Sequence, residues 1–557
     1  MKVLKVLIDE IKKNKNKIKN QRDLNSLKLQ FARSHGINFP TNIEIMNQVP
    51  KKDRDELKKI LMLKPVRTIS GVAPVAIMTK PHKCPHGSCL FCPGGPKSKF
   101  GDVPQSYTGK EPATRRAIRN GYDPYLQVMN RLEHYVLINQ NPEKVELIIM
   151  GGTFLSLSYD YVDEFVMYAF KAMNDFSELF YKDNELDIEK FQDFFEINTN
   201  RDDPERMNRI HAKLLKYKKT STLAKEKKRN EDSMIKCIGQ VIETRPDVCN
   251  EKHIDKMLEL GCTKVEVGIQ SVYDEALRVT GRQHTAQQGI DATQRLKDAG
   301  FKVTYHLMPG MIGVDRKKDL EGLKQIFTDT RYRPDMLKIY PCMVMPGTVL
   351  YDMYKEKRYK PMTTKQAVAL IAKFKDTIPE YVRVNRVQRD IPTTQVSKGV
   401  DKTNLRQYIM EYMKKHNLEC RCIRCREIKD TVIKGEIEYN LLVYEASEGD
   451  EVFISAEYND KIVGFCRLRF PYKPYRKEIT KKSALIRELH VYGASTSLKE
   501  KGTTQHKGVG KKLLAMAEDL VKKNNRNKIV VISGVGVRGY YKKLGYKLEG
   551  PYMVKKI

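Results

Sequence analysis

The chain has 557 residues, 40% of them hydrophobic, and this length is too great for one hydrophobic core, so two or three domains are expected. Lys and Arg outnumber Asp and Glu by 33; heat adaptation adds charges of both signs, so this surplus favours a polyanionic partner, nucleic acid first. The sequence lacks the apolar runs of a signal peptide or a membrane span, which excludes secretory and membrane classes and predicts a cytoplasmic protein.

Residues 1–63 predict a basic helical region. KNKNKIKNQR at 14–23 is dense in Lys and Asn, and the segments that follow carry apolar residues at helical spacing. A solvated helical face is one interpretation. We favour an RNA-binding arm, because few acidic residues balance the lysines.

Residues 64–380 predict an α/β domain. Short apolar strands alternate with helical segments, a pattern typical of a parallel sheet with crossover helices and of a partial TIM-type barrel. Ligands of such barrels bind at the carboxyl ends of the strands. The predicted strands lie at 145–154, 237–247, 264–271, 302–310 and 336–344.

Three further segments complete the predicted organisation. Residues 203–235 form a Lys-rich insertion, either a solvent-exposed helical excursion or part of an RNA surface. Residues 381–435 form an Arg-rich bridge that holds a second cysteine cluster. Residues 436–557 combine alternating strands with one amphipathic helix, which predicts a separate α+β domain.

The first cysteine cluster, PHKCPHGSCLFCPGG, spaces Cys84, Cys89 and Cys92 by four and two residues. Three thiolates in a reducing compartment can hold three irons of a 4Fe-4S cluster and leave the fourth iron open for a substrate. The alternative is a zinc site with His82 or His86 as the fourth ligand. Zinc sites usually pair their thiols as CxxC…CxxC, and that pairing is missing here.

The surroundings of this cluster favour the iron–sulfur interpretation. The cysteines follow the candidate strand TISGVAPVAIMTK, and the next apolar strand ends in Gly151, Gly152 and Thr153, where a ligand's amino group can approach the backbone. This arrangement resembles the radical S-adenosylmethionine superfamily. The resemblance implies that these three residues contact S-adenosylmethionine, together with Arg245 and Gln270 at the ends of later strands.

In the carboxy-terminal domain, QHKGVG reads as a QxxGxG motif before the amphipathic helix, and it spans Gln505, Gly508 and Gly510. Backbone amides at such a helix start bind a pyrophosphate. With strand RELHVYG before it and GVRGYYKKLGY after it, the motif resembles the GNAT acetyltransferase fold, which binds acetyl-CoA. Tyr540 or Tyr541 is then placed to protonate a leaving thiolate.

The two domains together resemble the Elongator catalytic subunit family. The resemblance is carried by TISGVAPVAIMTKPHKCPHGSCLFCPGGP, PQSYTGKEPATRRAIRNGYDPY, ELIIMGGTF, ETRPD, VQRDIP, RELHVYG and ISGVGVRGYYKKLGYKLEGPYMVK. It implies that a 5′-deoxyadenosyl radical takes a hydrogen from the methyl group of acetyl-CoA. The carbon then adds to carbon 5 of the wobble uridine in the tRNA anticodon stem-loop, and thioester hydrolysis leaves a carboxymethyl group.

The resemblance also assigns site residues position by position. Basic residues of the bridge are expected to contact RNA, namely Arg383, Arg386 and Arg389. Acetyl-CoA contacts are assigned to Lys144, Glu488, Leu489, His490, Val491, Val509, Gly510, Lys511 and Tyr541, and the QxxGxG motif adds Gln505 and Gly508.

The second cysteine cluster, CRCIRC, contains Cys420, Cys422 and Cys425. His416, or Cys342 through space, would complete a tetrahedral zinc site that braces the bridge. The alternative is three reduced thiols. The remaining cysteines are expected in the core, namely Cys237, Cys249, Cys262 and Cys466.

Two other functions compete with tRNA modification. A protein-lysine acetyltransferase with a structural iron–sulfur domain is the first, with Glu488 as its base. It leaves the Cys84–Cys92 motif and the positive charge without a purpose. A non-catalytic RNA-binding scaffold is the second, and the complete cofactor motifs argue against it.

Overall fold

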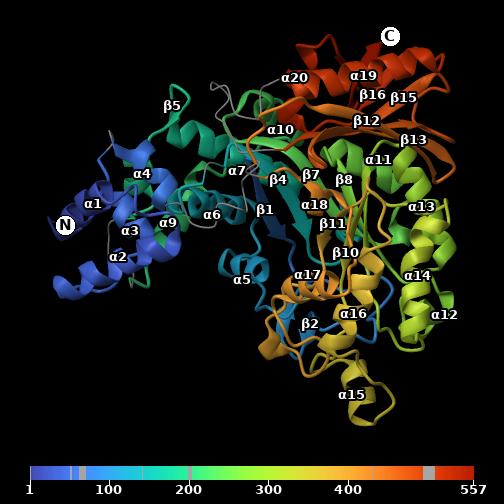
Figure 1. Cartoon of the computed structure of the whole chain (residues 1–557), viewed down its shortest axis with the longest axis horizontal. Coiled ribbons are helices and arrows are strands. Elements are labelled where there is room, and N and C mark those ends of the chain that lie inside the picture. Colours follow the sequence, from blue (N-terminus) through green and yellow to red (C-terminus); the bar gives the residue numbers. More distant parts are fainter. Residues whose placement is uncertain are drawn as a thin grey trace.

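The computed structural model describes residues 2–50, 53–61, 71–140, 142–197, 203–429, 431–492 and 508–557 (Figure 1). Four amino-terminal helices confirm the predicted helical region. They enclose a small core of their own that includes Leu7, Phe31 and Ile45. Capping boxes at Asn20 and Thr41 begin the second and third helices. The helices are α1 (Lys2–Lys13), α2 (Gln21–Ser34), α3 (Asn42–Gln48) and α4 (Arg54–Leu61).

A seven-stranded sheet forms the centre of the molecule, and all neighbouring strands in it are parallel. The strands follow one another in chain order, as in a barrel that is not closed, which confirms the predicted partial barrel. They are β1 (Val72–Met78), β4 (Lys144–Met150), β7 (Lys236–Thr244), β8 (Lys264–Gln270), β9 (Lys302–Leu307), β10 (Met336–Ile339) and β11 (Arg383–Arg386).

Crossover helices cover the outer face of this sheet. On β4, Val145, Leu147 and Ile149 are fully buried in the main core, whereas the alternate residues face the interior of the barrel. None of the described helices is both long and apolar enough to cross a membrane. The covering helices include α6 (Pro124–Leu137), α7 (Tyr159–Phe180), α11 (Glu251–Leu260), α13 (Ala286–Asp298), α14 (Arg316–Thr328) and α16 (Thr364–Lys375).

The Lys-rich insertion is helical, and one of its helices is packed. α9 (Arg206–Tyr217) is followed by α10 (Leu223–Asp232). Within α10, the buried Glu226 accepts a hydrogen bond of 2.8 Å from Asn174 of α7, and the Asn230 amide donates to the Ile235 carbonyl at 2.9 Å. The insertion is therefore helical, and α10 packs one face inward while its lysines lie on the other; a role in an RNA surface stays a prediction.

The second domain is a mixed sheet with α19 (Val509–Lys523) packed on it, which confirms the predicted α+β domain. β15 and β16 are parallel, and the other pairs are antiparallel. The strand order is β12 (Glu438–Ala446), β13 (Gly449–Tyr458), β14 (Lys461–Phe470), β15 (Ser483–Val491), β16 (Lys528–Val531), β18 (Tyr552–Lys556) and β17 (Lys547–Glu549).

This domain docks directly on the barrel. A Cβ atom at Gly534 would lie 2.1 Å from the Ile238 carbonyl oxygen, so only glycine allows this approach to β7. Arg487 pairs with Asp335 at 2.6 Å, and both side chains are fully buried. Buried charges are tolerated when they are paired in this way, and breaking such a pair is costly. β11, which lies in the predicted bridge, completes the barrel sheet.

Candidate active site

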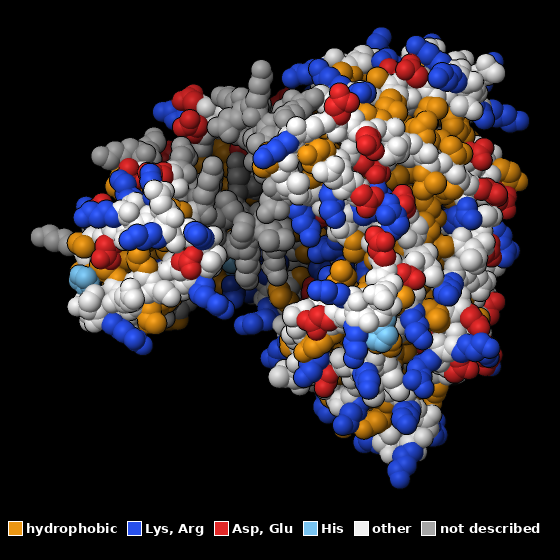
Figure 2. Space-filling view, viewed as in Figure 1, with side chains coloured by type: hydrophobic (Ala, Val, Ile, Leu, Met, Phe, Trp, Pro, Cys, Tyr) orange, Lys and Arg blue, Asp and Glu red, His pale blue; other side chains and the backbone are white. Residues whose placement is uncertain are grey.

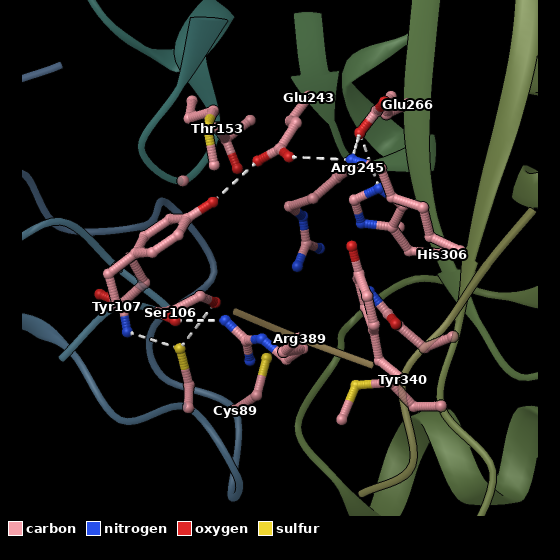
Figure 3. Close-up of a pocket in the computed structure, with 18 of the residues that line it drawn as sticks. Cys89, Ser106, Tyr107, Thr153, Glu243, Arg245, Glu266, His306, Tyr340 and Arg389 are labelled. Atoms are coloured by element: carbon pink, nitrogen blue, oxygen red, sulfur yellow. Dashed lines mark hydrogen bonds and ion pairs between the residues drawn. The ribbon is translucent and has the colours of Figure 1, made fainter. Parts of the chain in front are cut away.

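A pocket lies at the carboxyl ends of the barrel strands, and the loop that carries the first cysteine cluster forms one wall of it (Figure 3). The loop is fixed at Leu90, whose amide donates to the Thr280 carbonyl at 3.1 Å and whose carbonyl accepts from the Leu350 amide at 2.9 Å. The thiols of Cys84, Cys89 and Cys92 all line the pocket. The two neighbouring hydrogen bonds hold the thiol loop in place without using the sulfur atoms.

Hydrogen-bond donors surround the sulfur atoms. The Gln105 amide donates to Cys92 Sγ at 3.1 Å, and Arg282 Nη1 lies 3.6 Å from Cys89 Sγ. Burial raises the pKa of Cys84 to about 11; it also raises the pKa of Cys89, which Arg282 opposes. Without a bound metal the two thiols therefore stay protonated near neutral pH, and bound iron would supply the positive charge that ionises them.

The two cysteine clusters differ in spacing. Among the described residues, the sulfur atoms of Cys420, Cys422 and Cys425 lie within 4.8 Å of one another, a separation that suits one tetrahedral ion. The three thiols of the pocket do not form such a group. A wider spread fits a polynuclear cluster, in which each iron takes its own thiolate.

Two polar side chains in the same pocket are only partly hydrogen-bonded. Among the residues that the structure describes, neither Arg245 Nη1 nor Gln270 Oε1 has a hydrogen-bond partner, although both atoms are buried. Arg245 is held by Asp247 at 2.9 Å and by the Arg282 carbonyl at 2.8 Å. A buried unpaired donor and acceptor are costly unless a ligand completes them, so the pair fits the carboxylate and hydroxyl groups of S-adenosylmethionine.

The predicted glycine pair lies beside the thiols. Gly151 has φ +119°, and a Cβ there would lie 2.3 Å from Thr79 Oγ1, so the turn after β4 requires glycine. Gly152 and Thr153 line the pocket, and Gly151, just before them, packs closely against Thr79. The structure therefore brings the predicted thiols, glycine turn, Arg245 and Gln270 to one place.

A charged cluster deeper in the pocket was not predicted. Glu266 accepts from His306 Nε2 at 2.9 Å and pairs with Lys338, which also lies 3.7 Å from Glu243. The hydroxyl of Tyr107 donates to Glu243 at 3.2 Å. The cluster could have been predicted from a polar or charged residue within each mainly apolar strand, namely Glu266 in KVEVGIQ, His306 in KVTYHL and Lys338 in MLKI.

A second site lies on β15. Its first residues pair with β16 as far as Ile486, but from Glu488 to Val491 only β14 pairs with it in the described part of the chain. Such a splay between parallel strands leaves backbone groups free for a ligand. Glu488 is held by Arg467 Nε at 2.9 Å, and Arg467 keeps two further nitrogen atoms without hydrogen-bond partners among the described residues.

The start of α19 lies close to this splay. Gly508 has φ +82° and precedes the helix, whose first amides are free to bind an anion. A Cβ at Gly510 would lie 3.5 Å from the Tyr540 hydroxyl, whereas Tyr541 is buried with its ring 5.6 Å from that of Tyr546. Leu489, Val509 and Lys511 belong to the same two elements. Gln505 lies outside the described residues.

Lys144 begins β4, at the opposite end of that strand from the glycine turn. Its side chain is partly buried, and burial lowers its pKa. It therefore lies at the amino end of the barrel, the end on which the second domain docks, and not in the thiol pocket.

The predicted fourth ligands of the second cysteine cluster lie elsewhere. His416 Nδ1 lies 2.8 Å from the Tyr412 carbonyl, and its ring stacks on Tyr412, outside the three-thiol group. Cys342 is buried in a different hydrophobic cluster with Tyr359. Lys375 instead donates to Cys420 Sγ at 3.0 Å. The other four cysteines are buried, as predicted for core residues.

The bridge arginines are divided between the two sites. Arg383 is paired with Glu427 at 2.6 Å and donates to the Tyr492 hydroxyl at 2.8 Å, so it bonds within the protein. Arg386 and Arg389 line the thiol pocket, where Arg389 donates to the Ser106 carbonyl.

Comparison with known protein families covers most of the chain. The ELP3 N-terminal domain matches residues 1–69, the Radical SAM superfamily 78–323, the Radical SAM C-terminal domain 334–415 and the Acetyltransferase (GNAT) family 417–546. These matches agree with the helical region, the partial barrel and the second sheet that the structure shows.

Individual relatives match along nearly the whole length. A protein named tRNA uridine(34) acetyltransferase from Methanocaldococcus jannaschii is 44% identical over 99% of this chain and 97% of its own. Human Elongator complex protein 3 is 39% identical, over 96% and 93%. The solved structure of Elp3 from Methanocaldococcus infernus, lacking its residues 1–46, is 38% identical, has a TM-score of 0.71 and covers 88% of this chain and 100% of its own. The chain therefore belongs to the family of the tRNA uridine(34) acetyltransferases and Elongator complex protein 3.

Proposed function

We propose that this protein places a carboxymethyl group on carbon 5 of the wobble uridine of tRNA. The acetyl methyl carbon forms the new bond to carbon 5, and hydrolysis of the thioester releases CoA. The hydrogen atom lost from the acetyl methyl group would end on 5′-deoxyadenosine, while the hydrogen on carbon 5 would leave as a proton and its electron would replace the one used to cleave S-adenosylmethionine. A 4Fe-4S cluster would supply the electron that starts this reaction.

At the thiol end, the chain's own residues bind and orient. Cys84, Cys89 and Cys92 would hold the cluster, and the Gln105 amide and Arg282 stabilise the sulfur charge. Arg245 would bind the carboxylate of S-adenosylmethionine through its spare nitrogen, and Gln270 would accept from a hydroxyl or amine. Gly152 and Thr153 form the backbone wall beside them.

At the acetyl-CoA end, Glu488 to Val491 would bind the thioester arm, and the start of α19 the pyrophosphate. Burial opposes ionisation of Glu488, but Arg467 and Lys302 outweigh it and hold the pKa of this carboxyl below its usual value. An ionised Glu488 can position water for hydrolysis. Tyr540 is the more exposed of the two tyrosines, and its hydroxyl lies near the start of the helix, so we assign it the protonation of the leaving thiolate.

The RNA site would surround the mouth of the thiol pocket. Arg386 and Arg389 lie there, and Lys and Arg side chains cover much of the amino-terminal helices and the region around α15 (Val349–Lys355) (Figure 2). Phosphate contacts of this kind weaken as salt rises. An anticodon base is already unstacked, so presenting it to the pocket costs little.

For the second cysteine cluster we propose structural zinc, held by Cys420, Cys422 and Cys425. These thiols would supply three of the four ligands, and His416 lies outside their group. Lys375 would offset the negative charge of the three thiolates, because its ammonium lies 3.0 Å from Cys420 Sγ.

The observation that carries the proposed function is the pairing of two sites on one docked unit. The thiol pocket has an unpartnered arginine nitrogen, the splayed β15 has free backbone, and Asp335 with Arg487 fixes the two domains together at 2.6 Å. A protein-lysine acetyltransferase would need only the second site.

The test is nucleoside mass spectrometry of tRNA after anoxic reconstitution with reductant, S-adenosylmethionine and acetyl-CoA. We expect a carboxymethyl group on the wobble uridine with the wild-type protein and none with Cys89→Ala. Cys262→Ala is the matched control, because that thiol is buried away from the pocket. No adduct from protein with an intact cluster, together with acetylation of an added protein substrate, would support the protein acetyltransferase instead.

A further inference from the structure

The two proposed sites lie at opposite ends of the barrel strands. β4 begins at Lys144, beneath the second domain, and ends at Met150, in the thiol pocket. Six residues of strand span about 20 Å. Reacting atoms must come within roughly 3–3.5 Å of each other. Something must therefore cross the barrel before the acetyl group meets S-adenosylmethionine and the uridine.

The thiol pocket extends into the barrel as far as Ala76 and Ile148. TIM-type barrels are normally filled by branched apolar side chains. Here the interior-facing residues of β4 are all partly accessible to water, and so is Ala76, the partner of Ile148 on β1. The Glu146 side chain is 31% exposed, although β1 and β7 flank its strand on both sides. We call this accessible interior the lumen.

Charged groups line the lumen in steps from one end to the other. Near the amino end Lys264 Nζ lies 2.6 Å from Glu146. Glu266, two residues further along β8, contacts His306 and is the register partner of Glu243, which Figure 3 shows facing the thiol pocket. Polar groups at this depth are costly unless they bond, and they can exchange partners with the amides and carbonyl of a thioester arm.

The amino end of the lumen faces the splayed strand. Arg467, which holds the Glu488 carboxylate at 2.9 Å, also lies 3.7 Å from Asp335 at the amino end of the barrel. Arg383, at the start of β11, donates to the hydroxyl of Tyr492, the residue after β15, at 2.8 Å. Burial lowers the pKa of His490 to about 4, and both Glu488 and Glu146 lie close enough to act against that shift. These contacts place the proposed thioester site against the amino ends of the barrel strands.

We propose that the lumen of the barrel is the passage by which the acetyl-thioester arm of CoA, bound at the amino end, reaches the thiol pocket at the carboxyl end. This inference rests on the proposed function. In this arrangement the acetyl donor enters the barrel from the second domain, and the uridine enters from the thiol side.

Blocking the lumen at half height tests the passage. Glu146→Trp and, separately, Pro74→Phe add bulk at two paired, partly accessible positions that do not line the thiol pocket. We expect iron content, S-adenosylmethionine binding and acetyl-CoA binding to match the wild type, and the tRNA product to fall about 100-fold, as for other displaced reactants. Val443→Trp is the bulk control, because this residue is 66% exposed on β12. Wild-type product rates from either blocked variant would overturn the proposal.

A labelling experiment decides the question even if a blocked variant loses its cluster. Glu146→Cys is treated with a small thiol reagent and mapped by peptide mass spectrometry, with Val443→Cys as the control. Acetyl-CoA should slow labelling at position 146 and not at 443; equal rates at 146 with and without acetyl-CoA would overturn the passage. This arm needs no tRNA product, so inactivity of the wild type would count against the proposed function alone.

Discussion

The two ends of the barrel differ in how their buried polar side chains are paired. At the amino end, Asp335 lies 2.6 Å from Arg487, and Asp298 lies 2.6 Å from Arg469, with all four side chains fully buried. At the carboxyl end, Arg245 and Gln270 each keep a buried atom without a hydrogen-bond partner within the described ranges, and at the amino end Arg467 of the proposed acetyl-CoA site also keeps such atoms. Paired charges hold the domains together, and unpaired atoms leave room for a ligand. Polar substitutions should therefore cost stability at one end and activity at the other.

Asp335→Ala should have the largest effect on stability. Removing this carboxylate leaves Arg487 buried beside Glu451 alone, and breaking a buried pair costs about 3–5 kcal/mol of unfolding free energy. Chemical denaturation measures it. Glu275→Ala is the control, because its pair with Arg278 is exposed and worth about 0–1 kcal/mol. Equal losses in the two variants would mean that the buried network does not hold the domains.

A pH series contrasts two buried aspartates. Burial raises the pKa of Asp319 to about 7, and a bond from the Gly310 amide only partly opposes this. Burial also disfavours ionised Asp335, but Arg487 and Lys297 outweigh it, and the pKa of Asp335 falls well below its usual range.

A raised pKa in the folded state stabilises the fold at low pH, and that stability is lost as pH rises through the folded value. Between about pH 4, where Asp319 ionises in the unfolded chain, and about pH 7, where it ionises in the fold, the unfolding free energy of the wild type should fall relative to that of Asp319→Asn. The expected fall is roughly 2–4 kcal/mol, at about 1.4 kcal/mol per unit of pKa difference. Denaturation of both proteins at several pH values checks this. A constant difference would show that Asp319 ionises normally in the fold.

Arg245→Lys should separate binding from stability at the carboxyl end. Lysine keeps the charge beside Asp247 but loses the planar fork and its spare nitrogen. S-adenosylmethionine affinity should fall by about 1.5–3 kcal/mol, the range for a hydrogen bond to a charged group, with little change in unfolding free energy. Calorimetry on reconstituted protein measures the affinity. Unchanged affinity would remove Arg245 from the site.

Gln270→Gly gives the smallest and most specific change in stability. Gln270 has φ +64°, a conformation that glycine adopts without strain, so the variant should be about 0.5–1 kcal/mol more stable. Product formation should nevertheless fall, because the pocket loses a buried acceptor. Thermal unfolding and tRNA product are measured on one preparation. Higher stability with undiminished product would show that the strain serves no ligand.

Much of the fold could be predicted from the sequence, because the barrel strands are continuous apolar runs and the helices between them are amphipathic. The thiol pocket was predictable for a similar reason: its cysteines lie within nine residues of each other. The edge strand β12 was not predicted, because the successive residues Leu441, Leu442 and Val443 are all exposed and its sequence does not alternate.

Contacts between distant residues could not be read from the sequence. Arg487 and Asp335 are 152 positions apart, and nothing local marks them as partners. The charges of the lumen are also on separate strands, so their convergence needs the barrel. Closeness in the sequence can also mislead. The spacing of His416 from the cysteines suggested a metal ligand, but at the end of α17 (Leu405–Lys415) its ring stacks on Tyr412.

Transfer of deuterium tests most directly whether the two ends act on one substrate. Acetyl-CoA with a fully deuterated methyl group is supplied to the reconstituted protein with tRNA and S-adenosylmethionine, and the 5′-deoxyadenosine is analysed by mass spectrometry. The account predicts 5′-deoxyadenosine that carries one deuterium, in step with carboxymethylated tRNA. Unlabelled 5′-deoxyadenosine alongside modified tRNA would mean that the acetyl group never reaches the thiol pocket as the hydrogen donor.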